Sequence, residues 1–103
     1  MILPETYNKF YERCLKKMPE NLIGTDLSDG KTGFYSEALE LIDENGISNF
    51  LGEDDFVFMM HQGYTFWYFK ADGNSNPIVY GFQDGKTKPD DLGSFSHFIS
   101  EFK

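Results

Sequence analysis

Apolar side chains recur at helical spacing in three parts of the chain. In the first, Pro4 suits the opening turn of a helix over 4–18 and Pro19 ends it. In the second, Gly46 is placed to cap a helix over 36–45. In the third, Ser94 is a suitable N-cap for a helix over 94–102. The three apolar stripes are Leu3, Tyr7, Phe10, Tyr11, Cys14, Leu15 and Met18; then Ala38, Leu39, Leu41 and Ile42; then Phe95, Phe98, Ile99 and Phe102.

Between the second and third helices the pattern changes to runs of aromatic and β-branched residues. These runs predict strands over 56–62, 65–70 and 78–83. Gly63-Tyr64 predicts a two-residue hairpin, and Asp84-Gly85 predicts a second turn into a short edge strand at 86–88. Residues 19–33 predict a loop with a short strand at Leu22-Ile23. The chain therefore reads as one α+β domain over 1–103, an antiparallel meander flanked by helices.

The run Thr65-Phe66-Trp67-Tyr68-Phe69 does not alternate apolar and polar residues, as a strand with one buried face should. With a two-residue turn, one face of the hairpin is wholly apolar and is assigned to the main core: Phe58, Met60, Trp67 and Phe69. The other face mixes apolar and polar groups: Val57, Met59, His61, Phe66, Tyr68 and Lys70. A slip of one residue in the register would exchange the two faces.

Two interpretations of the mixed face are open. Another helix, or the segment 19–33, covers it. Alternatively, it binds a partner, because aromatic residues with polar tips suit interfaces and dominate binding energy. On that second hypothesis the anchors are His61, Tyr64, Phe66 and Tyr68.

The chain has 17 acidic and 9 basic residues, a formal net charge of −8. Without a Lys/Arg stripe, this charge disfavours nucleic acid as a partner. It is compatible with a basic protein partner, which an acidic surface would attract, although solubility alone would also account for it. The acidic groups expected to steer such a partner are Glu53, Asp54, Asp55 and Asp72.

Several features favour the cytoplasm. No apolar run approaches the roughly 18 residues that a membrane span needs. The opening MILPETYNKF lacks the basic region and apolar core of a secretory signal. The single cysteine, Cys14, fits a reducing compartment and is expected to be a buried small hydrophobe.

No catalytic residue, metal site or cofactor is predicted. His61 and His97 lie far apart without metal-ligand spacing. Residues 72–76 (DGNSN) resemble the start of a calcium loop, but Pro77 stands where Gly is needed and Gln83 where Glu is needed. We interpret this segment as a polar turn. An enzyme that uses a Cys14–His61 pair stays open as an alternative, although no motif supports it.

Four segments look familiar: LGEDDFVFMM, GYTFWYFKADG, NPIVYGFQDGK and SFSHFISEF. With the opening LPETYNKFY, which carries Leu3, Pro4, Tyr7 and Phe10, they resemble the SUKH superfamily, the Smi/Knr group named for a yeast cell-wall assembly regulator. The likeness is weakest over 19–49. The chain departs from the family in lacking a helical segment before the opening. It also has Glu53-Asp54-Asp55-Phe56 where members often carry further Gly.

This resemblance implies an α+β fold, a sheet flanked by helices, and no enzymatic activity. Many bacterial members look like immunity proteins, which bind and neutralise polymorphic toxins, often nucleases or deaminases. Others act as scaffolds in signalling. The resemblance carries over no catalytic residues. We therefore expect stoichiometric occlusion of a basic toxin domain, with an intracellular scaffold or regulatory adaptor as the alternative.

Overall fold

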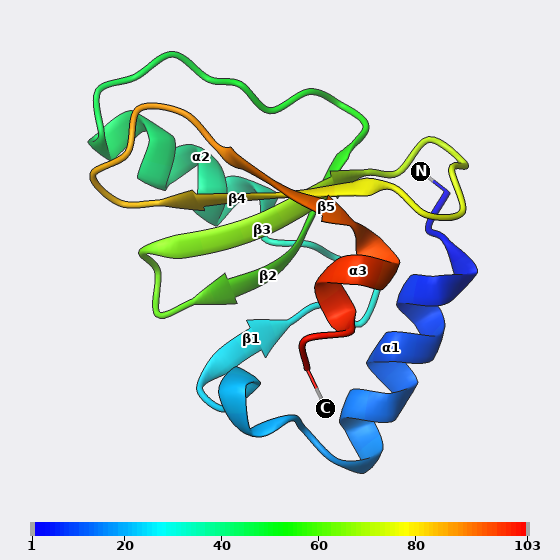
Figure 1. The fold of residues 1–103 in the computed structure, drawn as a ribbon. Helices are drawn as coiled ribbons and strands as arrows, with labels where there is room; N and C mark the ends of the chain where they lie inside the picture. The colour runs from blue at the N-terminus through cyan, green and yellow to red at the C-terminus, as the bar shows by residue number, and fades with distance from the viewer. Residues whose placement is uncertain (1, 103) are drawn as a thin grey trace.

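The computed structural model describes residues 2–102. Its strands form one antiparallel sheet in the order β1-β2-β3-β4-β5, so each strand pairs with the next along the chain (Figure 1). The predicted α+β class, a meander flanked by helices, is confirmed. The elements are α1 (Glu5–Lys16), the 3-10 turn η1 (Glu20–Leu22), β1 (Thr25–Leu27), α2 (Tyr35–Glu44), β2 (Asp55–His61), β3 (Thr65–Lys70), β4 (Ile78–Gln83), β5 (Asp90–Ser94) and α3 (Phe95–Ile99).

Both faces of the sheet are covered. Figure 1 shows α1 and α3 on one side and α2 on the other, with the long connector 45–54 running back from α2 to β2. The first side holds Tyr7, Phe10, Phe58, Phe69, Phe95 and their neighbours. The second holds Ala38, Leu41, Ile42, Leu51, Val57, Met60, Phe66, Tyr68 and Phe82, with Phe50 packed against them. This decides the question that the aromatic strand raised: a helix covers its mixed face.

The hairpin between β2 and β3 differs from the expected one. His61 pairs with Thr65, so the turn holds three residues, two of them with positive φ: Gln62 at 50° and Gly63 at 80°. A β-bulge between Val57 and Met59 shifts the register again. As a result Met59 joins the α1 side and Met60 the α2 side, the reverse of the predicted assignment.

Three elements also differ from their predicted bounds by three residues or more. The first strand lies at 25–27 and not at the predicted Leu22-Ile23. Leu22 instead ends η1, and its side chain is buried in the core. The last strand is Asp90–Ser94, beyond Pro89, where Asp91 and Asp90 pair with Tyr80 and Gly81; the segment 86–88 that was predicted as a strand belongs to the connection. α3 ends at Ile99, although Ser94 caps it as expected by accepting a hydrogen bond from the His97 amide.

The centre of the α1 side is Tyr7, which is fully buried. Its ring meets those of Phe56, Phe58, Phe69 and Phe95 at centroid distances of 5.7 to 5.9 Å. Its hydroxyl donates a hydrogen bond to the carbonyl of Ser28. Tyr7 therefore joins α1 both to the sheet and to the segment that follows β1.

The remainder of α1 follows its predicted stripe with one exception. Phe10 and Cys14 are buried, but Leu15 is 68% exposed. The prediction of a buried Cys14 is confirmed, and burial raises the pKa of its thiol. A buried thiol with a raised pKa is a poor nucleophile.

Candidate protein-binding surface

The structure divides the predicted binding residues between the two ends of the sheet. β2 begins at Asp55 and ends at His61, and at about 3.3 Å per residue these ends lie about 20 Å apart. Glu53 and Asp54 precede β2, and Asp72 joins them because the Ala71 amide donates to the Asp54 carbonyl at 2.7 Å. His61 and Tyr64 lie at the opposite end. The predicted residues therefore do not form one patch.

Two predicted anchors are not on the surface. Phe66 is 0% exposed and Tyr68 is 5% exposed, because α2 and the connector cover them. Phe50 of the connector stacks on both rings, with centroids 6.3 and 5.9 Å away. The prediction that these two side chains contact a partner is therefore wrong for this structure. Burial, and next the nearby Asp55 carboxylate, raise the pKa of the Tyr68 phenol.

Asp55 is likewise buried, with 7% of its surface exposed. Its Oδ2 accepts a hydrogen bond from the Gly52 amide at 2.8 Å and closes the turn before β2. Its position therefore does not suit long-range steering. Glu53, Asp54 and Asp72 are exposed and keep that predicted capacity.

The segment that follows β3 is the polar turn that its sequence predicted. Asp72 Oδ1 accepts from the Asn74 amide at 3.2 Å. Asn74 Oδ1 in turn accepts from the Asn76 amide at 2.9 Å. These side chains hold their own backbone in successive turns, as Asx residues commonly do.

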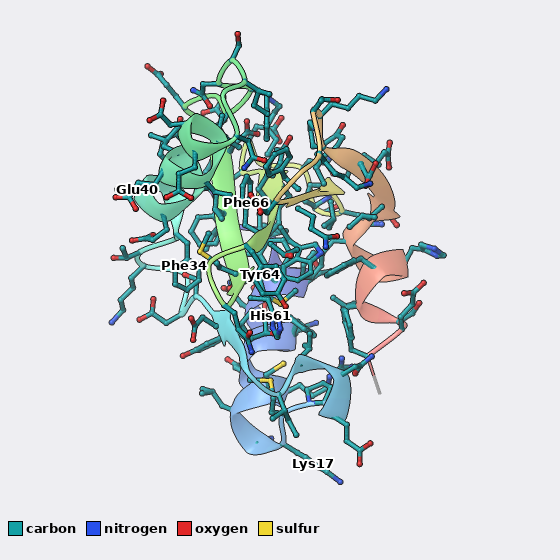
Figure 2. The ribbon with its side chains drawn as sticks, turned by 90° about the vertical axis from the view of Figure 1, so that its left-hand side faces the viewer. Lys17, Phe34, Glu40, His61, Tyr64 and Phe66 are labelled. Atoms are coloured by element: carbon teal, nitrogen blue, oxygen red, sulfur yellow. The ribbon has the colours of Figure 1, made fainter. Side chains whose placement is uncertain are left out.

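At the other end of the sheet, Tyr64 is the accessible aromatic. It is 41% exposed, and Figure 2 shows it beside His61 where the β2–β3 turn ends the sheet. The two rings meet edge to face at 5.5 Å. His61 is half-buried, and its Nδ1 lies 2.8 Å from Thr25 Oγ1, which links the turn to edge strand β1. His61 thus supports the turn, and Tyr64 presents the free surface.

Hydrogen bonds join this turn to the C-terminal end of α2. The Asp84 amide donates to the Tyr64 carbonyl at 2.8 Å. Asn45 then donates through Nδ2 to Asp84 Oδ1 at 3.0 Å and accepts from the Gly85 amide at 2.8 Å. Sequence reasoning missed this linkage; the available signals were an Asn at the predicted helix end and the Asp84-Gly85 turn.

The outer side of α2 is acidic. Glu37, Glu40 and Glu44 recur three and four residues apart, so they share one helix face, and all are exposed. Figure 2 shows Glu40 directed away from the sheet. From residue 32 to residue 69 the sequence has seven acidic residues and no Lys or Arg. Because all nine basic residues lie outside this segment, it carries −7 of the formal net charge of −8.

α1, on the opposite side of the sheet, has a mixed surface. Together with its C-cap, Lys17, it carries Glu5 and Glu12 and the basic residues Lys9, Arg13 and Lys16. Figure 2 shows Lys17 at the far end of the molecule from Glu40. α1 thus presents charges of both signs to solvent, whereas α2 presents only acidic ones.

Within residues 2–102, no three His, Cys, Asp or Glu side chains are grouped so that they could hold a metal ion. In the same part of the chain, none of the helices has the length and apolar character to cross a bilayer. No family model, curated protein or solved structure matches the chain.

Proposed function

We propose that this chain is a non-enzymatic protein-binding domain that uses the acidic outer side of α2 to hold a basic partner. The observation that carries the proposal is the exposed stripe of Glu37, Glu40 and Glu44, which no basic residue of the segment 32–69 interrupts. Such a one-sided field raises the rate of encounter with an oppositely charged protein and disfavours like-charged ones.

Tyr64 supplies an aromatic contact area, which charged side chains alone do not provide. It is an exposed aromatic on a turn that hydrogen bonds fix against the end of α2. A rigid aromatic side chain gives a large contact area at little cost in conformational entropy, and such residues are common binding hot spots. The stripe and Tyr64 together form the candidate surface, and the hydrogen bonds of Asp84 and Asn45 link the turn of Tyr64 to the end of α2.

The kind of partner follows from the resemblance to the SUKH superfamily. We propose an immunity-type role in the cytoplasm, in which the domain occludes a basic toxin domain of nuclease or deaminase type at a 1:1 ratio. The second candidate is an intracellular scaffold or adaptor, which the same family resemblance supports. It would bind several partners weakly and would have no single tight one.

The test is affinity capture from the lysate of the native host at low and high salt, read by mass spectrometry. Two variants are compared with the unchanged chain. Glu37→Lys/Glu40→Lys reverses charge on α2, and Glu12→Lys/Glu20→Lys makes the same chemical change on the other side of the molecule. We expect one basic protein near 1:1, loosened by salt, and bound about tenfold or more weakly by the α2 variant alone.

Co-expression then decides between the two roles. An immunity protein must rescue growth of cells that produce the captured partner, and the α2 variant must rescue less well than its control. Capture of several substoichiometric proteins without any rescue would favour the adaptor. Equal binding by both double variants would contradict the assignment of the surface to α2.

A further inference from the structure

A pocket of about 370 Å³ lies where the start of β2 passes the N-terminal end of α2. It is lined by Gly33, Phe56 and Val57, by Tyr35 of α2, and by the charged residues Lys31, Glu53 and Asp55. Most of the lining is therefore apolar, with two carboxylates among it. Sequence reasoning had named Glu53 and Asp55 but gave no reason to place them in a concave site.

The pocket exists because the sheet is incomplete here. β1 pairs with β2 only at Met59 to His61, and Ser28 adds one bond to the Phe58 carbonyl. The edge of β2 from Asp55 to Val57 is therefore not paired with β1. Segment 31–35 approaches it instead, and the Phe34 amide donates to the Val57 carbonyl at 2.9 Å.

Gly33 permits that approach. A Cβ atom at this position would lie 2.7 Å from the Val57 carbonyl oxygen and 3.0 Å from the Phe56 ring. Any side chain there would push the segment away from the strand. The close fit lets Tyr35 and the β2 edge line one pocket.

The unusual group in the pocket is the Asp55 side chain. It is more than nine-tenths buried, and the Gly52 amide is the donor that the structure gives to it. Among the described residues, the ion pair that the structure contains is Lys86–Asp90, on another part of the surface. A buried carboxylate without a cation costs free energy, which a positively charged ligand would offset.

The register adds a further acceptor. The Asp54 carbonyl accepts from Ala71, so it points toward β3. Backbone groups of successive strand residues point to opposite sides, so the Asp55 carbonyl points toward the open edge. The edge thus adds a carbonyl to a pocket that the side chains of Glu53, Asp55 and Tyr35 also line. The Tyr35 hydroxyl donates to the Leu51 carbonyl at 3.4 Å and keeps its capacity to accept.

We propose that this pocket receives the side chain of an arginine from the protein partner. Several acceptors around one pocket suit a planar guanidinium, which has five donors, better than the compact ammonium of lysine. The apolar floor suits the aliphatic stem of the residue. The inference rests on the proposed function for the identity of the partner, but the pocket and its ligand chemistry can be tested without it.

The probe is N-acetyl-arginine methylamide, titrated into the full ¹⁵N-labelled chain and followed by amide chemical shifts. Its matched control is the citrulline compound, which has the same shape and no charge. We expect saturable shifts at Gly33, Asp55 and Val57 with a Kd of about 1–10 mM, and binding of citrulline that is at least about tenfold weaker. Equal shifts with both compounds, or shifts confined to other residues, would overturn the proposal.

Substitutions in the pocket test which charged groups act on the bound arginine. Glu53→Gln should weaken arginine binding about threefold or more, whereas Glu12→Gln, the same change on the exposed surface of α1, should leave it unaltered. Asp55→Asn should weaken it most. Lys31→Gln should strengthen arginine binding, because the Lys31 ammonium, which also lines the pocket, repels the probe. If Glu53→Gln and Asp55→Asn both bind the probe with unchanged affinity, the site is refuted.

Failure of this inference and failure of the proposed function are distinguishable. If the probe does not bind but charge reversal on α2 still weakens the partner, only the arginine pocket is wrong. If the probe binds as expected and α2 reversal has no effect on the partner, the pocket stands and the α2 surface does not.

Discussion

The two sides of the sheet are built differently. The side under α1 and α3 packs its rings mostly edge to face around Tyr7, and its outer surface has mixed charge. The side under α2 stacks Phe50, Tyr68 and Tyr80, with interplanar angles of 29° and 24°. This second side also contains the buried Asp55, the pocket and the acidic stripe. The first side is therefore expected to provide most of the stability, and the second to combine packing with recognition.

The largest effect should come from the centre of the first side. Phe58 is fully buried and its ring lies 5.1 Å from Phe69 and 5.7 Å from Tyr7. Phe58→Ala should lower the free energy of unfolding by about 3–5 kcal/mol. On the second side, Phe50 is half-buried, and Phe50→Ala should lower the free energy of unfolding by about 2 kcal/mol. Urea unfolding measures both, and equal losses would break the comparison.

The next largest effect concerns the close approach that forms the pocket. Gly33→Ala places a methyl group 2.7 Å from the Val57 carbonyl and should destabilise the fold by about 1–3 kcal/mol. Gly52→Ala is the matched control, since its Cβ would lie at an ordinary 3.7 Å from Asp55 Oδ2. Thermal unfolding of both variants should separate them; if they unfold together, the segment can move without cost.

Alkaline pH should probe both sides at once. Burial raises the pKa of Tyr7 and of Tyr68 above the ordinary value of 10.0. Above about pH 10 the unfolded chain releases these protons while the folded chain keeps them, so the free energy of unfolding should fall as pH rises. Tyr68→Phe should reduce this fall and leave stability at pH 7 nearly unchanged. Urea unfolding between pH 8 and 11 measures this. If the free energy of unfolding falls equally in Tyr68→Phe and in the unchanged chain, burial of Tyr68 is not the cause.

The smallest effect is expected at Leu15 of α1, and the buried Cys14 beside it serves as the contrast. Leu15 is 68% exposed, so Leu15→Gln should change the free energy of unfolding by no more than about 0.5 kcal/mol. Cys14 is 5% exposed, and Cys14→Ser should cost about 1–3 kcal/mol because a hydroxyl enters an apolar cluster. Denaturant unfolding of the pair tests the stripe; a large loss for Leu15→Gln would show that α1 is rotated from its described position.

The long elements were predicted well, because helical periodicity and runs of aromatic and β-branched residues are properties of a single segment. β3 and β4 were predicted with the bounds that the structure gives, Thr65–Lys70 and Ile78–Gln83. The cap at Ser94 was also found, since it depends on contacts within one turn. The last strand was missed because Asp90 to Ser94 has little β-branched or aromatic character, and its pairing with β4 supplies the strand.

The candidate site was less predictable. The sequence pointed to Tyr64 as exposed and to Glu53 and Asp55 as acidic, but it could not say that Asp55 is buried or that Glu53 borders a pocket. It assigned Phe66 and Tyr68 to a partner because nothing local shows that Phe50, 16 and 18 residues earlier, covers them.

The sequence by itself determined the class of fold, the order of the main elements and the excess of negative charge, because these follow from composition and local spacing. Tertiary structure decided that both sheet faces are covered, that Met59 and Met60 join opposite sides after the bulge, and which acidic groups stay exposed. The physical reason is that burial depends on segments distant in the chain. Here the connector 45–54 runs back across the sheet and buries Phe66 and Tyr68 under Phe50, and no local pattern encodes that path.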